Sequence, residues 1–352
     1  MKKNIYLAIC VAISLTVLPL CMYNSSAVTK DKTVVSQISS TQANTQTESE
    51  GESESESESN IPETTEKDST DNQEMICIYL SDEKKTLTLP LRDYIIGVVA
   101  AEMPAAYEEE ALKAQAAASI TLARRKMQTV TDADGLDGAV ITTNSKRDQG
   151  YMSVEKMHER WGEEFDVYYE KIASAVDEVY SYQIMYDGEP IIAAFHAIST
   201  GVTECAENVW EEKKDYLVSV ESEGDKLSST YESTLSLSGE KLEEYLSAAT
   251  GFKSKGKESE WLGECEYTEA GTLTSVEICS EVFTGAALRE ILSLRSAAME
   301  IEYSDGEFVF TVKGYGHGVG LSQYGADYYA RQGYTWQEIV AHYYPGTQLE
   351  KI

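Results

Sequence analysis

The chain has 352 residues and a formal net charge of −31 at pH 7, with 60 acidic and 29 basic residues. This length leaves room for one or two domains with a substantial core. The acidic balance argues against nucleic acid as a partner, because a nucleic-acid-binding surface needs clustered lysine and arginine.

The N-terminal stretch, residues 1–27, predicts a membrane anchor. Lys2 and Lys3 precede an apolar run from residue 5 to residue 22, which is the order found in an export signal. The run is long for a signal peptide and just long enough to span a bilayer. We expect an uncleaved anchor and an extracytoplasmic protein that faces the cell wall. Cleavage after the small residues 25–27 is the alternative.

Residues 28–75 predict a linker. The segment is rich in Ser, Thr, Gln and Glu, and it contains the Glu-Ser repeat of residues 52–58. Such a composition cannot bury a core, so we expect a disordered tether between the membrane and the domain that follows.

Residues 76–352 predict one folded domain of the α+β class. Residues 76–80 and 86–91 predict a hairpin around the polar residues 81–85. A helix follows, and Pro104 predicts that it ends near Glu102. The next helix is expected to run to residue 128, and later helices are expected over 154–181, 238–249, 286–294 and 323–331, with one more from residue 335. Strands are expected over 182–185 and 190–195 and on both sides of Gly271, and a hairpin turn is expected at 304–306.

Glu102 is the leading candidate for a catalytic acid. It lies between Ala101 and Met103 in an apolar run, at the negative end of the predicted helix dipole. The apolar neighbours and the helix dipole both favour the neutral form of the carboxyl, so we predict that its pKa is raised. A carboxyl that is protonated near neutral pH can act as a general acid. An ordinary polar residue at a helix end is the alternative.

Residues 314–320 have glycine at every second position. The pattern removes side chains and permits close approach by another chain segment or by a ligand. A tight bend without a ligand is the alternative.

Four cysteines lie outside the anchor, and none forms a CxxC pair, so we predict no metal site and no cofactor. Cys265 and Cys279 flank a predicted hairpin turn, which leaves a disulfide and free thiols both open. The remaining two are Cys77 and Cys205.

Two long segments resemble the signature blocks of the stage II sporulation protein D / LytB family. They read GVVAAEMP…EALKAQA over residues 97–116 and GYGHGVGLSQYGA…HYYPGT over residues 314–347. Between them, residues 195–210 and 288–296 resemble further blocks in the family's order. The resemblance covers residues 76–352.

This resemblance implies a peptidoglycan lytic transglycosylase. Such an enzyme cleaves the bond between N-acetylmuramic acid and N-acetylglucosamine in peptide-stripped strands and leaves 1,6-anhydromuramoyl ends. The family's catalytic glutamate falls on Glu102. One acid suffices in principle, because the sugar's own 6-hydroxyl is the nucleophile, whereas hydrolytic glycosidases use two carboxylates. The implied setting is septal thinning during engulfment, with an amidase and a membrane scaffold as partners, although vegetative wall turnover stays open.

Other candidate residues come from the same blocks, and structural hydrogen bonding is the alternative for each. The residues expected to bind substrate are Gln115, Arg124, Ser199, His317, Ser322, Gln323 and Tyr324. His196 and Ser199 lie in the block associated with zinc in some relatives. Cys205 is the only thiol near them in sequence, so we assign no metal.

The chain departs from the family pattern after Gln115, where Ile120 and Leu122 replace an arginine and a tyrosine. This departure favours an alternative: a glycan-binding module that enhances a partner amidase, as in the LytB branch. A purely structural wall protein is a third reading.

Overall fold

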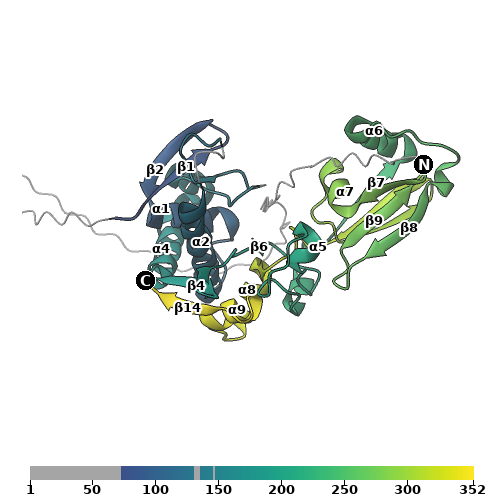
Figure 1. Ribbon diagram of the computed structural model, residues 1–352. Coiled ribbons are helices and arrows are strands. Elements are labelled where there is room, and N and C mark those ends of the chain that lie inside the picture. Colours follow the sequence, from purple (N-terminus) through teal and green to yellow (C-terminus); the bar gives the residue numbers. More distant parts are fainter. Residues whose placement is uncertain (1–72, 131–134, 146) are drawn as a thin grey trace, which may run out of the picture. The chain divides into compact units, whose positions relative to one another are not determined.

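The computed structural model describes residues 73–130, 135–145 and 147–352 (Figure 1). The predicted anchor and nearly all of the predicted linker lie outside these residues. Within the described part of the chain, no helix has the length and apolar character needed to span a bilayer. The described residues combine helices with small, mainly antiparallel sheets, as expected for an α+β protein.

Helix α2 (Glu109–Thr129) lies at the centre of the first hydrophobic core. It packs against α1 (Leu91–Glu102) and α4 (Phe165–Val179). The alanines in its middle are fully buried, and their small side chains allow neighbouring helices to approach closely. The predicted hairpin forms from β1 (Met75–Leu80) and β2 (Lys85–Pro90), and β3 (Ile141–Thr142) adds a parallel strand to β1.

The long helix expected over residues 154–181 is broken into two. Helix α3 (Val154–Trp161) ends at Gly162, which has a positive φ of 53°, and a short 3-10 turn, η2 (Gly162–Glu164), leads into α4. A glycine adopts this backbone conformation without strain. The prediction of one continuous helix was therefore wrong at Gly162.

The C-terminal elements complete the first core. Strand β14 (Gln348–Lys351) pairs with β4 (Tyr182–Tyr186), which turns at Asp187–Gly188 into β5 (Glu189–Pro190). The second strand is shorter than predicted, because the chain leaves this sheet after Pro190. It pairs again only at β6 (Phe195–His196), which lies parallel to β13 (Leu321–Ser322).

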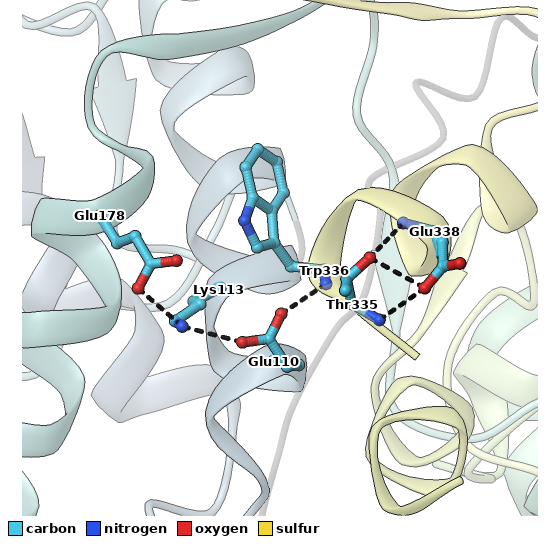
Figure 2. A network of polar contacts seen from close by, with 6 residues as sticks. All are labelled: Glu110, Lys113, Glu178, Thr335, Trp336 and Glu338. Carbon is cyan, nitrogen blue, oxygen red and sulfur yellow. Dashed lines mark hydrogen bonds and ion pairs between the residues drawn. The ribbon is translucent and has the colours of Figure 1, made fainter. Parts of the chain in front are cut away.

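Helices α8 (Gln323–Arg331) and α9 (Trp336–Tyr343) follow β13 and pack on α2. Thr335 and Glu338 form a capping box at the start of α9, where the sequence predicts a helix. Figure 2 shows how this cap continues into α2, because the Trp336 amide donates to Glu110 over 2.7 Å. Lys113 then bridges Glu110 and Glu178 of α4 at 2.8 and 2.7 Å. These contacts link three helices that are far apart in the sequence.

A second hydrophobic core is built from residues 232–313. Two three-stranded antiparallel sheets form it, with strand orders β10-β9-β8 and β11-β12-β7. Its elements are β7 (Glu232–Ser238), α6 (Gly239–Thr250), η4 (Glu258–Glu260), β8 (Leu262–Tyr267), β9 (Leu273–Ile278), β10 (Glu281–Thr284), α7 (Gly285–Ile291), β11 (Met299–Ser304) and β12 (Glu307–Lys313). Ser238 and Thr284 cap α6 and α7, and α7 ends three residues earlier than expected.

Cys265 and Cys279 do not form a disulfide. Cys265 lies opposite Val276 in the β8–β9 pair, and Cys279 follows the end of β9, so the two do not face each other. All four cysteines of the described residues are free thiols.

The alternating glycines of residues 314–320 allow one chain segment to lie against another. All four have positive φ values between 72° and 115°. A Cβ on Gly320 would lie 2.1 Å from the carbonyl oxygen of Ala194, and one on Gly316 would lie 2.7 Å from the Cβ of His196. Any larger residue would therefore separate these segments, which accounts for the glycines without a ligand.

Candidate active site

Glu102 is the last residue of α1, as the sequence predicts. The chain turns to an extended conformation at Met103, with φ −121° and ψ 146°, because Pro104 disfavours helical geometry there. The helix end lies inside the first core, and only 2% of Glu102 is exposed. The carboxyl is thus removed from solvent by the elements packed around the end of α1.

The two carboxyl oxygens of Glu102 have different surroundings. The Gly150 amide donates to Oε1 over 2.5 Å, whereas Oε2 accepts no hydrogen bond within the described residues. Burial raises the pKa of Glu102 to about 7, against the opposing effect of the Gly150 amide bond and of the nearby Gln323 side-chain amide, which favour the charged form. The carboxyl is therefore close to half protonated at neutral pH, with one oxygen unpaired.

The side-chain amide of Gln323 lies close enough to Glu102 to affect its pKa, and it belongs to a chain of amide contacts. Gln323 donates to Gln115 over 3.2 Å, and Gln115 donates to Ser119 over 3.1 Å. Gln149 donates to the hydroxyl of Tyr94 over 3.3 Å. These bonds fix the orientation of each amide. Two of the residues predicted to bind substrate, Gln115 and Gln323, thus belong to the surroundings of Glu102.

Ser199 and Ser322 meet at a different buried acid, Asp225, which sequence reasoning missed. Ser199 donates to Asp225 from its amide at 2.8 Å and its hydroxyl at 2.5 Å, and Ser322 donates from its hydroxyl at 2.8 Å. Ser322 also caps α8 by accepting from Gly325. Both serines have the structural hydrogen-bonding role that was their alternative. Asp225 thereby fixes the start of the helix that carries Gln323.

The other predicted residues lie in other contacts. The His317 ring lies between Trp210 and His196, at centroid distances of 5.1 and 5.8 Å. The Tyr324 ring meets the edge of Tyr107. Arg124 binds Glu74 at 2.8 Å and donates to the Tyr180 carbonyl at 3.0 Å. These contacts give Arg124 a structural role, and its binding to substrate stays a prediction.

No group of three histidine, cysteine, aspartate or glutamate side chains that could hold a metal occurs in residues 73–130, 135–145 and 147–352. His196 is fully buried, and its Nδ1 pairs with the carbonyl of Val319 at 3.1 Å. Burial lowers the pKa of His196 to about 4, so it is neutral at physiological pH.

Two residues that contact the acid could not be found from local patterns. Gly150 lies in the irregular segment between β3 and α3, and a Cβ built on it would lie 3.0 Å from Oε1 of Glu102. Gln149, its neighbour, has no special spacing from Glu102 in the sequence. Only the folded chain brings this segment to the end of α1.

Comparison with known proteins agrees with the sequence resemblance. A family model described as stage II sporulation protein matches residues 79–186, which include Glu102, Gln115 and Gly150. The chain is 34% identical to stage II sporulation protein D of Bacillus subtilis (strain 168) over 277 residues, covering 78% of this chain and 79% of the relative. It is also 34% identical to stage II sporulation protein D of Bacillus amyloliquefaciens over 275 residues, covering 78% of each. An amidase enhancer of Bacillus subtilis (strain 168) is 26% identical over 305 residues, or 72% of this chain and 40% of that protein. With this identity over most of both chains, the protein belongs to the stage II sporulation protein D family.

Proposed function

We propose that the protein is a peptidoglycan lytic transglycosylase with Glu102 as its only general acid and base. The observation that carries the proposal is the buried carboxyl of Glu102, whose pKa is raised to about 7 and whose Oε2 has no partner within the described residues. A structural carboxyl this deeply buried normally has both oxygens satisfied. An unpaired, protonatable oxygen is what a general acid requires.

The proposed reaction uses the two oxygens of Glu102 in different roles. Oε1 stays bound to the Gly150 amide, and the proton on Oε2 passes to the glycosidic oxygen as the bond from the muramoyl C1 breaks. The resulting carboxylate then accepts the proton of the 6-hydroxyl as that oxygen attacks C1 and closes the 1,6-anhydro ring. The attack is intramolecular, so it gains the rate advantage of proximity. Because Oε2 is buried, a sugar reaches it only after a neighbouring segment moves.

Product analysis with the purified protein tests this proposal. Incubation with peptide-free glycan strands, followed by mass spectrometry, should reveal 1,6-anhydromuramoyl ends. Reducing ends in their place would indicate hydrolysis, and the absence of any product would reject the enzymatic proposal.

The pH dependence of cleavage should report the protonation of Glu102. Because the acid form starts the reaction, the rate should fall as pH rises through about 7, by about tenfold per pH unit above that value. Initial rates on peptide-free strands from pH 5 to pH 9 measure this limb. A rate that stays level up to pH 9 would contradict the assignment.

Gly150→Ala should reduce cleavage about tenfold or more, because the added Cβ displaces the amide that orients Oε1. Fold and thermal stability should change far less than activity. The matched control is Gly263→Ala, whose Cβ would meet the Glu277 side chain at the same closest distance of 3.0 Å. If both variants cleave like the wild type, the Gly150 contact has no role in the reaction.

An amidase-enhancing module is the second candidate, favoured by the 26% identity to an amidase enhancer. This function predicts that the purified protein produces no cleavage and stimulates an amidase on intact wall. It also predicts that the stimulation survives Glu102→Gln, which separates the two functions in a single assay.

We further propose a setting in sporulation, since two relatives that are 34% identical over 78% of this chain are named stage II sporulation protein D. In this proposal the protein is anchored in the membrane and faces the wall, together with an amidase that strips peptides and a membrane scaffold. Fractionation of sporulating and vegetative cells would test the location and the stage at which the protein accumulates.

A further inference from the structure

One face of α2 leads away from Glu102. Gln115, Ser119, Leu122 and Lys126 follow each other at spacings of four, three and four residues, which places them on one side of the helix. The first two belong to the amide chain around Glu102, and the last two line a pocket. Eleven residues of helix separate the two ends of this face by about 16 Å.

The opposing segment runs beside the same face of α2. Gly150 binds Glu102, Gln149 approaches the Ser119 carbonyl at 3.4 Å, and Asp148 pairs with Lys126 at 2.6 Å. Asp148 also lines this pocket, and it lies two residues from Gly150, which binds Glu102. The pocket is therefore no more than about 7 Å of chain from the group that binds the acid.

Two depressions adjoin here, with volumes of about 320 and 430 Å³, and they share Arg125 and Thr129. We call them together the cationic groove. The first is largely apolar, with Leu122, Phe195 and Trp210 in its lining. The second contains Tyr186 and Tyr216, whose rings pack at a centroid distance of 5.2 Å. Apolar and aromatic surface in an elongated depression suits the faces of sugar rings.

Five basic and four acidic side chains line the cationic groove. Three of the basic side chains are paired, Lys126 with Asp148 at 2.6 Å, Lys214 with Glu212 at 2.5 Å and Lys213 with Asp215 at 3.9 Å. Arg125 donates to the carbonyl of Pro190 and has no carboxylate partner within the described residues. Arg147 is exposed, and its guanidinium has no partner in that same part of the chain. Two guanidiniums and one carboxylate, Glu189, thus have no ion-pair partner within the described residues, which leaves the lining with one net positive charge in a protein whose net charge is −31.

We propose that the cationic groove binds the carboxylate-bearing sugars of a glycan strand, with Arg125 and Arg147 contacting the lactyl carboxylates of muramic acid. This inference rests on the proposed function and adds sugar positions beyond the cleaved bond. A guanidinium suits this task, because its planar fork matches the two oxygens of a carboxylate. In a peptide-free strand a carboxylate recurs on every second sugar, so an elongated groove with more than one guanidinium fits the polymer.

A binding experiment with matched strands tests the groove. The full-length chain carrying Glu102→Gln, which prevents cleavage, is titrated with native peptide-free strands and with strands whose muramoyl carboxylates have been reduced to alcohols. Native strands should bind roughly tenfold more tightly at low salt, from the loss of charge-assisted hydrogen bonds in the reduced strands. Adding Arg125→Gln and Arg147→Ala should remove that preference and leave the affinity for reduced strands unchanged.

Lys241→Ala is the matched control, because it removes a positive charge from an exposed site on α6, outside the groove. Lys241→Ala should keep the full preference for native strands. Arg147→Lys should keep part of that preference, since lysine retains the positive charge but lacks the planar guanidinium that matches two carboxylate oxygens. Equal affinity for native and reduced strands would overturn the proposal. So would equally tight binding of poly(glycerol phosphate), which would indicate a general anion site.

The same materials separate this proposal from the proposed function. If the protein prefers native strands but cleaves none, the groove proposal stands and the transglycosylase proposal fails. If the protein cleaves native and reduced strands and binds both equally, the transglycosylase proposal stands and the groove proposal fails.

Discussion

Glu102→Gln should abolish cleavage of peptide-free strands, with a loss of at least about 10²–10⁴ in rate. The loss should lie at the upper end of this range, because in the proposed reaction no second carboxyl can donate or accept the proton. Glutamine keeps an oxygen that can accept from the Gly150 amide, so the geometry of the site should survive. Quantifying anhydromuramoyl ends by mass spectrometry measures the effect.

Glu109→Gln is the control for this variant, because Glu109 is an exposed glutamate in the first turn of α2. It should cleave like the wild type. Undiminished anhydromuramoyl ends from Glu102→Gln would defeat the assignment of the acid.

The stability of the same variant gives an independent reading of the Glu102 pKa. The pKa is raised in the folded state from an ordinary 4.5 to about 7, so the folded chain holds its proton more tightly than the unfolded chain. The contribution of Glu102 to stability is therefore fully present below pH 4.5 and is lost as pH rises through 7. Over this range the wild type should lose roughly 3 kcal/mol relative to Glu102→Gln in denaturant unfolding.

Asp225→Ala should be the most destabilising substitution in the site region, by about 3–5 kcal/mol. It leaves three donors from Ser199 and Ser322 without their acceptor in a fully buried place. Burial raises the pKa of Asp225 to about 6, so removing this carboxylate also removes the cost of a buried charge. The three unpaired donors and the cavity that the substitution leaves outweigh this gain in stability. Denaturant unfolding at pH 7 measures the change.

Two variants bracket this result. Asp225→Asn should cost far less, because its oxygen can accept from Ser199 while its amide donates to the Ser322 hydroxyl. Asp82→Ala, at an exposed turn, should be close to neutral. Equal stabilities of Asp225→Ala and Asp225→Asn would show that the three donors find other partners.

The features that sequence reasoning placed correctly are local ones. Pro104 fixes the end of α1, and the Thr335–Glu338 spacing fixes the start of α9, because each signal acts within a single turn of chain. The burial of Glu102 followed from the apolar residues beside it. The broken helix at Gly162 was missed, since the residues on both sides of it carry a helical pattern.

The surroundings of the acid could not be predicted in the same way. Gly150 reaches Glu102 from an irregular segment, and Asp225 gathers two serines from distant parts of the chain. These contacts depend on how separate elements pack, which no short pattern encodes. The family blocks nevertheless placed Gln115 and Gln323 in one group, and the fold joins them by a hydrogen bond.

The bond between Gln115 and Gln323 joins residues that are 208 positions apart in the sequence. Ser322 also reaches back 97 positions to Asp225. During synthesis Glu102 therefore lacks its final neighbours until nearly the whole polypeptide has been made. Contacts of such long range form late and slowly. The proposed cleavage activity is therefore absent from every incompletely synthesised chain.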